Sequence, residues 1–407
     1  MELKTVDPAA KARLHSGPEG CASGGPGTAM ETGMTEARTA VVGQRVEIQV
    51  LTTLKCNLRC SYCSLGVGEV LGSQKKARYS VDQLAAFVER HLQGKEVYFT
   101  LYGGEPTLNV DFGLQLMERF PHSRFNLQTN GTLLHRVPDE LLRRLSNMLV
   151  SVDGGQAITD RHRGKGVYAR ILRNVMAVRE RTDASITARM TLWSGETSFE
   201  EIDSLTGLFD YVYFQFAQDE GANTPASVAA KKAVLDRLVE KFFASDMLYP
   251  IVPLMGTVRN KVAPWRLNEI SGGITQCRVS TNLLNVMPDG KIYPCPDMLY
   301  AQELQQGDVV ENWVKRSPLT PHPDMPCRGC SAYAYCRGNC MKNMYLAYVK
   351  KDEHWRTAVV EPICELIRHM GEAIDRHDWR AWHAHASVPV RNRLVNAEIY
   401  EFCEVMP

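Results

Sequence analysis

The 407-residue chain has almost no net charge, no long apolar run and no secretory signal, and each absence excludes a class of protein. Its 47 Lys and Arg residues against 46 Asp and Glu leave a formal charge of +1, whereas proteins that bind nucleic acid through bulk charge are strongly basic. No stretch reaches the roughly 18 to 20 apolar residues of a membrane-spanning helix. The N-terminus lacks the basic and then apolar pattern of a signal peptide. We therefore expect a cytoplasmic protein with no nucleic-acid and no membrane partner.

Cysteine, in contrast, is abundant. The chain has 12 cysteines, although cytoplasmic proteins keep their thiols reduced and rarely form disulfides. All but Cys21 and Cys403 fall into tight or regular spacings. Such spacings favour metal ligands over disulfides.

Short β-rich runs alternate with helical stretches in the first half of the chain. We expect strands over residues 46–53, 96–102, 124–129, 147–152, 185–192 and 211–216. A helix is expected after Ser80, which has capping-box spacing with Gln83, and others over 138–145 and 169–179. This alternation predicts an α/β fold of parallel βα units with right-handed crossovers. The chemistry of such folds gathers at the carboxyl ends of the strands.

The flanking regions differ in composition from this core. Residues 1–44 are rich in Gly, Pro, Ala, Thr and Glu without apolar periodicity, and we expect a disordered extension. Residues 220–270 predict a linker with one good helix. Residues 271–370 are dense in cysteine and turns, which indicates a small domain organised by metal, with helix over 354–376. Residues 371–407 form a tail that we expect to pack back on the body.

Three cysteines follow the first predicted strand in CxxxCxxC spacing, namely Cys56, Cys60 and Cys63. A loop can bring three thiolates to one centre at this spacing, but a structural zinc site needs four protein ligands. A four-iron cluster held by three cysteines leaves one iron free for an outside ligand. A zinc loop with a remote fourth ligand is the alternative.

The run CNLRCSYC, placed at the end of the first strand of a repeated βα unit, resembles the cluster motif of the radical S-adenosylmethionine (SAM) enzymes. The resemblance implies a partial (β/α)6 TIM-like barrel as the core, over residues 45–219. It implies that the free iron chelates the amino and carboxylate groups of SAM. One electron then splits the sulfonium into methionine and a 5′-deoxyadenosyl radical, which abstracts hydrogen from substrate. Tyr62 matches an aromatic position near the adenine, and packing of the loop is its alternative role.

The motif YGGEP after the second strand is a further mark of this family. Gly103 and Gly104 permit a close approach of backbone to a ligand. Glu105 is expected to accept hydrogen bonds from the SAM ammonium, which is a charge-assisted contact.

Later strand ends add to the resemblance. Asn130, in QTNGT, is expected among the cofactor-binding residues. Ser151 and Arg189 match positions that contact the ribose and carboxylate region of SAM, because an arginine fork fits a carboxylate. Asp160 and Arg163 match a D-x-x-R pattern in a substrate-side loop.

A second cysteine series occupies the C-terminal region. It consists of Cys277, Cys295, Cys327, Cys330, Cys336, Cys340 and Cys364. The series matches, cysteine for cysteine, the auxiliary-cluster domain called SPASM. The run VMPDGKIYPC predicts a β-hairpin that turns at Asp289 and Gly290. A pair of zinc sites is the alternative reading of the short spacings.

The SPASM resemblance implies two further [4Fe–4S] clusters. Cys277, Cys295 and Cys340 would hold the nearer one. The farther one would be held by Cys327, Cys330, Cys336 and Cys364. The nearer cluster is then one protein ligand short, so its fourth position is open or is taken by another side chain, with Glu269 or the remote Cys403 as candidates.

Families that combine these two modules mostly modify peptides or proteins, so we expect an oxidoreductase-type enzyme that matures a ribosomally made precursor peptide. The expected product is a thioether or carbon–carbon (cyclophane) cross-link between side chains. The expected cofactors are SAM and three [4Fe–4S] clusters, and the expected partners are the precursor peptide and an electron donor of flavodoxin or ferredoxin type. We expect no leader-binding module before the first strand, so that leader capture would need a separate protein or an edge strand of this chain.

Three other functions remain open. The first is a maturase of sulfatase type, which oxidises Cys or Ser to formylglycine and uses eight auxiliary cysteines, one more than this chain has. The second is a radical dehydrogenase or epimerase of an aminoglycoside or other sugar. The third is an electron carrier without enzymatic activity, which has no need of a SAM site.

Overall fold

The computed structural model describes residues 44–63, 76–271, 275–279, 282–299, 301–338 and 340–401. The predicted N-terminal extension, Cys21 and Cys403 lie outside the described residues, as does the side chain of Glu269.

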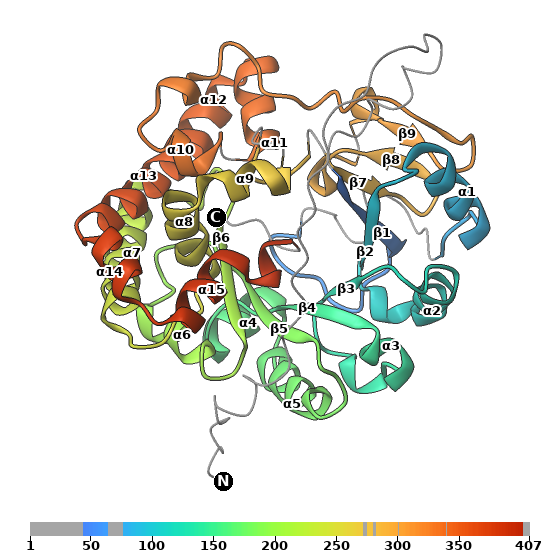
Figure 1. Ribbon diagram of the computed structural model, residues 1–407, viewed down its shortest axis with the longest axis horizontal. Coiled ribbons are helices and arrows are strands. Elements are labelled where there is room, and N and C mark those ends of the chain that lie inside the picture. Colours follow the sequence, from blue (N-terminus) through green and yellow to red (C-terminus); the bar gives the residue numbers. More distant parts are fainter. Residues whose placement is uncertain are drawn as a thin grey trace, which may run out of the picture.

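The six predicted strands are confirmed, and they form a parallel sheet in chain order. They are β1 (Arg45–Thr53), β2 (Glu96–Gly103), β3 (Phe125–Thr129), β4 (Leu145–Ser151), β5 (Ser185–Leu192) and β6 (Tyr211–Phe216). The helices that follow the strands surround the curved sheet (Figure 1). They are α1 (Val81–His91), α2 (Val110–Arg119), α3 (Asp139–Arg143), α4 (Gln156–Arg163), α5 (Val167–Arg179) and α6 (Phe199–Leu205). The fold is therefore the expected partial barrel of α/β class.

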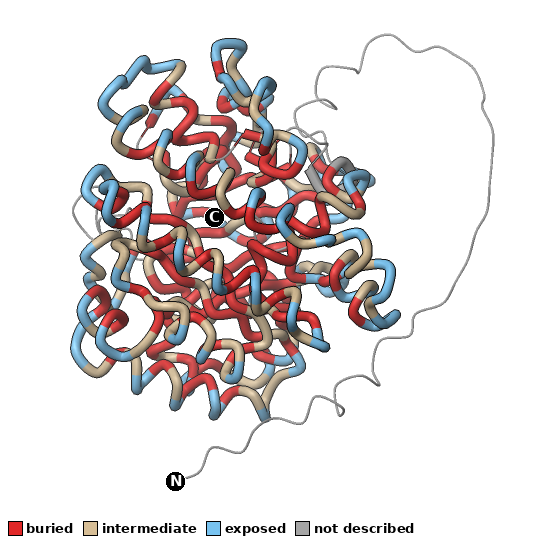
Figure 2. Tube along the Cα trace, turned by 90° about the vertical axis from the view of Figure 1, so that its left-hand side faces the viewer, coloured by how far each residue is buried: buried red, intermediate tan, exposed pale blue. Residues whose placement is uncertain are grey.

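Local sequence accounts for these elements. The Ser80 side chain accepts a hydrogen bond from the Gln83 backbone (3.1 Å), and the Gln83 side chain accepts one from the Ser80 backbone (2.9 Å). This capping box starts α1, whose apolar residues, such as Leu84 and Phe87, are fully buried against the sheet. Figure 2 shows the same division over the whole chain, with buried residues inside and exposed ones at the outer turns.

The sheet continues past β1 into the C-terminal region, which the sequence did not predict. The expected hairpin is present as β7 (Leu283–Val286) and β8 (Lys291–Tyr293), and Gly290 in its turn has a φ of 95°. Strand β7 pairs in parallel with β1, while β9 (Gly307–Asp308) and β10 (Trp313–Val314) extend the sheet to ten strands. The cysteine-rich region is thereby joined to the barrel edge, and Cys295 leaves β8 close to the barrel mouth.

The expectation of one helix in the linker is wrong. The segment holds α7 (Pro225–Ala244), α8 (Val252–Val262) and α9 (Pro264–Ser271). Helix α8 is buried along most of its length, and Ile251 before it forms a β-bridge with Val212 of β6. The segment therefore covers the outer edge of β6, which would otherwise expose unpaired backbone groups.

Helices occupy most of the described residues from 333 to 401. They comprise α10 (Tyr333–Cys336), α11 (Met341–Met344), α12 (Glu353–Trp355), α13 (Glu361–Asp375), α14 (Trp379–His385) and α15 (Val388–Asn396), with π-helical turns over Tyr345–Val349 and Arg356–Val360. The predicted helix over 354–376 is thus present in three consecutive pieces.

The tail packs against the body, as expected. The short helix η10 (Glu398–Glu401) lies at the starts of the barrel strands. There the Glu401 carboxylate pairs with Arg45 and with Arg124 (3.0 Å), and Tyr98 donates a hydrogen bond to the Glu401 carbonyl (2.8 Å). No helix within the described ranges combines the length and the apolar character needed to cross a membrane.

Candidate functional site

The carboxyl ends of the strands surround a cavity of about 510 Å³, within the usual size range of cofactor and ligand sites. The cavity brings together nine of the ten residues that the sequence predicted to hold SAM or its cluster. They are Cys56, Cys60, Tyr62, Cys63, Gly103, Gly104, Asn130, Ser151 and Arg189.

The loop that follows β1 carries the first three thiols, and hydrogen bonds hold it to its neighbours. Asn57 donates to the Thr132 hydroxyl (2.8 Å), and the Ser61 backbone donates to the His162 carbonyl (3.0 Å). Burial raises the pKa of Cys56 to about 11. This thiol therefore stays protonated at neutral pH until a metal displaces the proton.

The two glycines of YGGEP are required by the chain itself. A Cβ on Gly103, whose φ is 134°, would lie 2.2 Å from the Thr53 carbonyl oxygen, and one on Gly104 would lie 2.3 Å from that of Lys55. The Gly104 backbone donates to Thr53 (2.8 Å) and that of Glu105 to Lys55 (2.7 Å). These backbone hydrogen bonds hold the end of β2 against the start of the cysteine loop, and the end of β2 also lines the cavity.

Glu105 is the predicted cofactor-binding residue that does not line the cavity. Its side chain is 0 % exposed. The carboxylate accepts hydrogen bonds from the Thr107 backbone (3.1 Å) and hydroxyl (2.5 Å), from the Thr129 hydroxyl (2.7 Å) and from the Asn130 backbone (2.7 Å). These bonds tie the end of β2 to the end of β3. The contact of Glu105 with the SAM ammonium stays a prediction.

Tyr62 lies in the cavity wall within a buried ionic network. Its hydroxyl donates to the Asp153 carboxylate, which also accepts two bonds from Arg163 (2.7 and 3.0 Å). Burial opposes the charge of Arg163, yet Asp153 holds the pKa of its guanidinium above the ordinary value. Trp193 stacks on the Tyr62 ring at 5.7 Å. The packing role considered for Tyr62 is therefore present, alongside its exposure to the cavity.

The D-x-x-R pair has structural partners. Asp160 accepts hydrogen bonds from the backbones of Gly166 (2.8 Å) and Tyr168 (2.9 Å) at the start of α5. Arg163 lines the cavity, but its Nε and one of its terminal nitrogens donate hydrogen bonds to the Asp153 carboxylate. The assignment of these two residues to substrate receives no support from the contacts.

Ser151 and Arg189 are register partners on β4 and β5, and both face the cavity. Arg189 donates to the Gln215 side chain on β6 (2.8 Å), and its guanidinium lies 5.7 Å from the centre of the Tyr213 ring. The cation is thus aimed across the strand ends, where a ligand carboxylate could reach it.

Three thiols of the C-terminal region also line this cavity, namely Cys277, Cys295 and Cys340. The Cys340 sulfur lies 3.6 Å from the side-chain oxygen of Gln218. Burial raises the pKa of the Cys295 thiol well above its ordinary value.

Several cavity residues were missed from sequence, among them Trp193, Gln218, Asp297 and Lys342. Trp193 directly follows β5, so its place at a strand end was an available signal. Asp297 and Lys342 each stand two residues after a cysteine of the C-terminal region. Their side chains approach each other across the wall at 3.9 Å.

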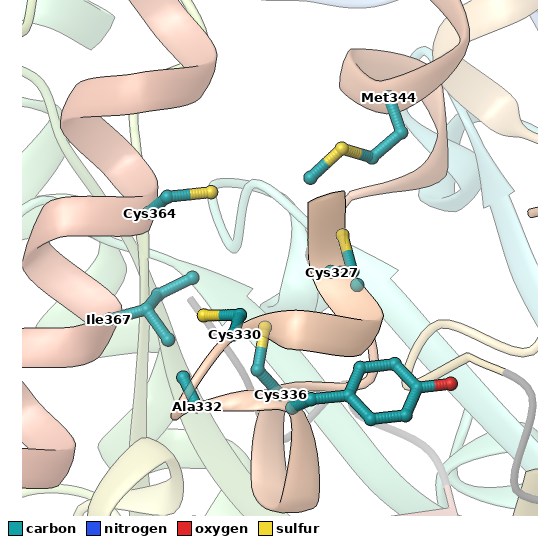
Figure 3. Close-up of a pocket in the computed structure, with 9 residues that line it drawn as sticks. Cys327, Cys330, Ala332, Cys336, Met344, Cys364 and Ile367 are labelled. Carbon is teal, nitrogen blue, oxygen red and sulfur yellow. The ribbon is translucent and has the colours of Figure 1, made fainter. Parts of the chain in front are cut away.

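Four other thiols surround a separate, smaller pocket in the C-terminal region, and Figure 3 shows them around a common space. They are Cys327, Cys330, Cys336 and Cys364, with Ala332, Met344 and Ile367 as neighbours. Six of the ten thiols thus line one cavity and four line another, and these four are the set that the SPASM resemblance implied for the farther cluster.

The donor chemistry fits iron–sulfur clusters. Each set consists of thiols, which are soft ligands that select iron–sulfur clusters, zinc or copper(I). No group of three or more His, Cys, Asp or Glu side chains among the described residues is arranged to hold a single metal ion. The thiol sets therefore do not converge as a mononuclear zinc site requires.

Comparison with known proteins gives several maturases among the relatives. The chain is 24% identical over 322 residues to the mycofactocin maturase MftC of Mycobacterium ulcerans, covering 71% of this chain and 81% of that protein. It is 24% identical over 338 residues to a cysteine-type anaerobic sulfatase-maturating enzyme of Clostridium novyi, covering 71% and 85%.

Solved structures share the fold. Native anSMEcpe with bound AdoMet superimposes with a TM-score of 0.61 at 18% identity, over 81% of this chain and 97% of that one. Streptococcus suis SuiB bound to its precursor peptide SuiA gives 0.52 at 14% identity, over 75% and 74%.

The Radical SAM superfamily matches residues 50–206. This range contains the cysteine loop and the cavity-facing ends of β2 to β5. This match implies a [4Fe–4S] cluster and SAM, and the thiol-lined, polar cavity fits both. Residues 50–206 are therefore identified as a radical SAM domain, and the relatives support an iron–sulfur, SAM-dependent enzyme.

Proposed function

We propose that this enzyme matures a ribosomally made precursor peptide by forming an oxidative cross-link between side chains. The observation that carries the proposal is that six thiols, three from the loop after β1 and three from the C-terminal region, line one cavity. A substrate in this space lies between a centre that starts a radical reaction and a centre that can take an electron away. We assign residues 45–219 to the first centre and 271–370 to the second, with 220–270 as a helical bridge and 371–407 as a supporting tail.

SAM is proposed to bind between the cysteine loop and the strand ends. Cys56, Cys60 and Cys63 would hold a cluster with one open iron position. Arg189 would pair with the SAM carboxylate through its guanidinium fork, with Ser151 beside it. Gly103 and Gly104 would offer backbone without side chains.

The second and third clusters are proposed on the remaining seven cysteines. When bound, the clusters supply single electrons, both for the cleavage of SAM and for removal of the electron that the substrate loses. The balance for a cross-link is the loss of two hydrogen atoms. One leaves to the 5′-deoxyadenosyl radical, and the other leaves as a proton and an electron. A donor of flavodoxin or ferredoxin type is proposed to supply the electron that starts the reaction.

Support for a peptide substrate comes from the relatives. Five of the curated relatives are named as maturases or maturating enzymes, and the solved neighbours include anSMEcpe with a Cp18Cys peptide and SuiB with its precursor peptide. A separate protein or an edge strand is proposed to capture the leader. The seven auxiliary cysteines favour cross-linking over formylglycine formation, for which the resembling enzymes use eight.

The proposal is tested by assembling the clusters without air and adding SAM, a reductant and the short peptide encoded beside the gene. We expect about 12 irons per chain from three four-iron clusters, formation of 5′-deoxyadenosine, and a peptide that loses two hydrogen atoms per cross-link. The triple variant of Cys56, Cys60 and Cys63 to Ala should lose about a third of the iron and all SAM cleavage. Cleavage retained in this variant would refute the SAM-site assignment.

Sulfatase-type maturation is the second candidate, because the similarity to the Clostridium novyi enzyme spans 85% of that protein. A peptide carrying the Cys of a sulfatase motif separates the two. Conversion of Cys to formylglycine releases sulfur, so the peptide mass falls far more than in a cross-link. Formylglycine without any cross-linked product would replace the first proposal by this one.

A further inference from the structure

Asn130 stands in an unusual relation to the first cluster motif. The Cys56 sulfur receives two hydrogen bonds, from the Leu58 backbone (3.4 Å) and from the Asn130 side-chain nitrogen (3.6 Å). Among the described residues, no side chain donates a hydrogen bond to Cys60 or Cys63. One of the three thiols therefore has a dedicated amide donor.

The orientation of this amide is fixed by its other partners. The Asn130 side-chain oxygen accepts hydrogen bonds from the Thr132 backbone (3.0 Å) and hydroxyl (2.6 Å), and a backbone N–H can only donate. The nitrogen must therefore face the other way, toward Asn57 (2.9 Å) and Cys56. Both amide protons are thus in use, and Asn130 is only 7 % exposed.

The backbone of Asn130 is held equally firmly. Its N–H donates to the buried carboxylate of Glu105 (2.7 Å), which also binds Thr129 (2.7 Å). Glu105 therefore positions the residue that contacts the Cys56 sulfur. Glu105 thus supports the residue beside the cluster motif.

We propose that Asn130 is a positioning residue that raises the reduction potential of the SAM-binding cluster by donating a hydrogen bond to the Cys56 thiolate. The inference rests on the proposed function, in which Cys56 holds that cluster. Reduction adds negative charge, part of which resides on the thiolate sulfurs. A nearby N–H stabilises the more negative state more strongly, and hydrogen bonds to the sulfurs are one of the factors that set cluster potentials.

Two variants remove the donor in different ways. Asn130→Leu removes the whole amide. Asn130→Asp keeps an oxygen for both Thr132 bonds and replaces the donor by an acceptor. Asn174→Leu is the matched control, because Asn174 is equally buried (5 % exposed) and binds the carbonyls of Gly131 and Thr132 (2.9 Å each) in the same loop, without contact to sulfur.

The measurement is a redox titration of the full-length, three-cluster protein, followed by electron paramagnetic resonance. The SAM-binding cluster is identified by the signal that changes when SAM is added. We expect Asn130→Leu to make one-electron reduction of this cluster about tenfold less favourable, a shift of about 59 mV to more negative potential. Asn130→Asp should shift it further, and Asn174→Leu should leave it in place. The Fe–S(Cys) stretching bands in resonance Raman spectra should move only in the Asn130 variants.

The outcomes separate the two levels of the argument. If the wild-type protein shows no SAM-sensitive signal, the proposed function fails. If that signal is present and both Asn130 variants keep the wild-type potential, the inference alone is overturned. Loss of the cluster from both variants would also overturn it, because the amide would then serve to hold the cluster rather than to set its potential.

Discussion

The two thiol-lined regions differ in ligand count and in surroundings. The barrel-mouth cavity presents its thiols in sets of three among polar and charged side chains such as Arg189 and Lys342. The C-terminal pocket presents four thiols among Ala332, Met344 and Ile367. Four thiolates cap every iron of a four-iron cluster, whereas three leave one position open. The difference teaches that the number of thiols around a site indicates whether a four-iron cluster there would keep an iron open to another ligand.

The largest effect is expected when the four thiols of the C-terminal pocket are removed, because this should stop cross-linking while leaving SAM cleavage intact. With Cys327, Cys330, Cys336 and Cys364 replaced by Ala, we expect the loss of about a third of the iron and at least a roughly hundredfold loss of cross-linked peptide. Formation of 5′-deoxyadenosine should persist, because the barrel-mouth cavity is intact. Iron analysis and chromatography of the two products check this. Equal loss of both products would show that the two regions are not separable.

The second-largest effect is expected on the unfolding free energy, when the buried pair of Asp153 and Arg163 is broken. Arg163→Met leaves the Asp153 carboxylate buried without its cation, and breaking a buried pair costs about 3–5 kcal/mol. Arg161→Met on the same helix is the control, because Arg161 pairs with Glu196 at the surface, where a pair contributes about 0–1 kcal/mol. Denaturant unfolding of both variants measures the two costs. Similar costs would mean that the network does not support the cavity wall.

The variant Glu105→Gln distinguishes two roles of Glu105, which are contact with SAM and the hydrogen bonds that join the ends of β2 and β3. The carboxylate accepts four hydrogen bonds, and an amide has one oxygen for them, so we expect a loss of roughly 1–3 kcal/mol in unfolding free energy. The iron content should be unchanged. A weaker SAM affinity at undiminished stability would instead restore the ammonium contact that the sequence suggested.

The elements with local signals could be predicted from the sequence. The strands from β1 to β6, the capping box at Ser80 and the hairpin at Gly290 depend on neighbouring residues, and all are present. The four thiols of the C-terminal pocket also followed from spacing, through the resemblance to known families.

Features that depend on distant partners could not be predicted in this way. Whether Glu105 faces the cavity or the interior depends on Thr129 and Asn130, some 25 residues later. The pairing of β7 with β1 joins residues more than 200 positions apart. The buried helix α8 gives no amphipathic pattern, because its whole surface is covered.

The smallest predicted effect concerns Lys231, which supports the polar cavity wall at a place without thiols. The Lys231 ammonium donates to the carbonyls of Trp193 (3.2 Å) and Ala222 (3.0 Å) and to the Asn223 side chain (2.8 Å), and burial lowers its pKa to about 8. It thereby ties the segment after β5 to the segment after β6. In the unfolded chain a lysine pKa is about 10.4.

The direction of the pH effect follows from this difference in pKa. Between pH 8 and about 10.4 the unfolded chain binds more protons than the folded one, so the contribution of Lys231 to stability rises with pH. We expect the unfolding free energy of the wild type, relative to Lys231→Met, to increase by about 1 kcal/mol from about pH 7.5 to about pH 9. Unfolding curves of both proteins at the two pH values measure it. A decrease in this relative unfolding free energy would mean that the folded protein binds the proton of Lys231 more tightly than the unfolded chain does. The hydrogen bonds of the ammonium would then outweigh the cost of its burial.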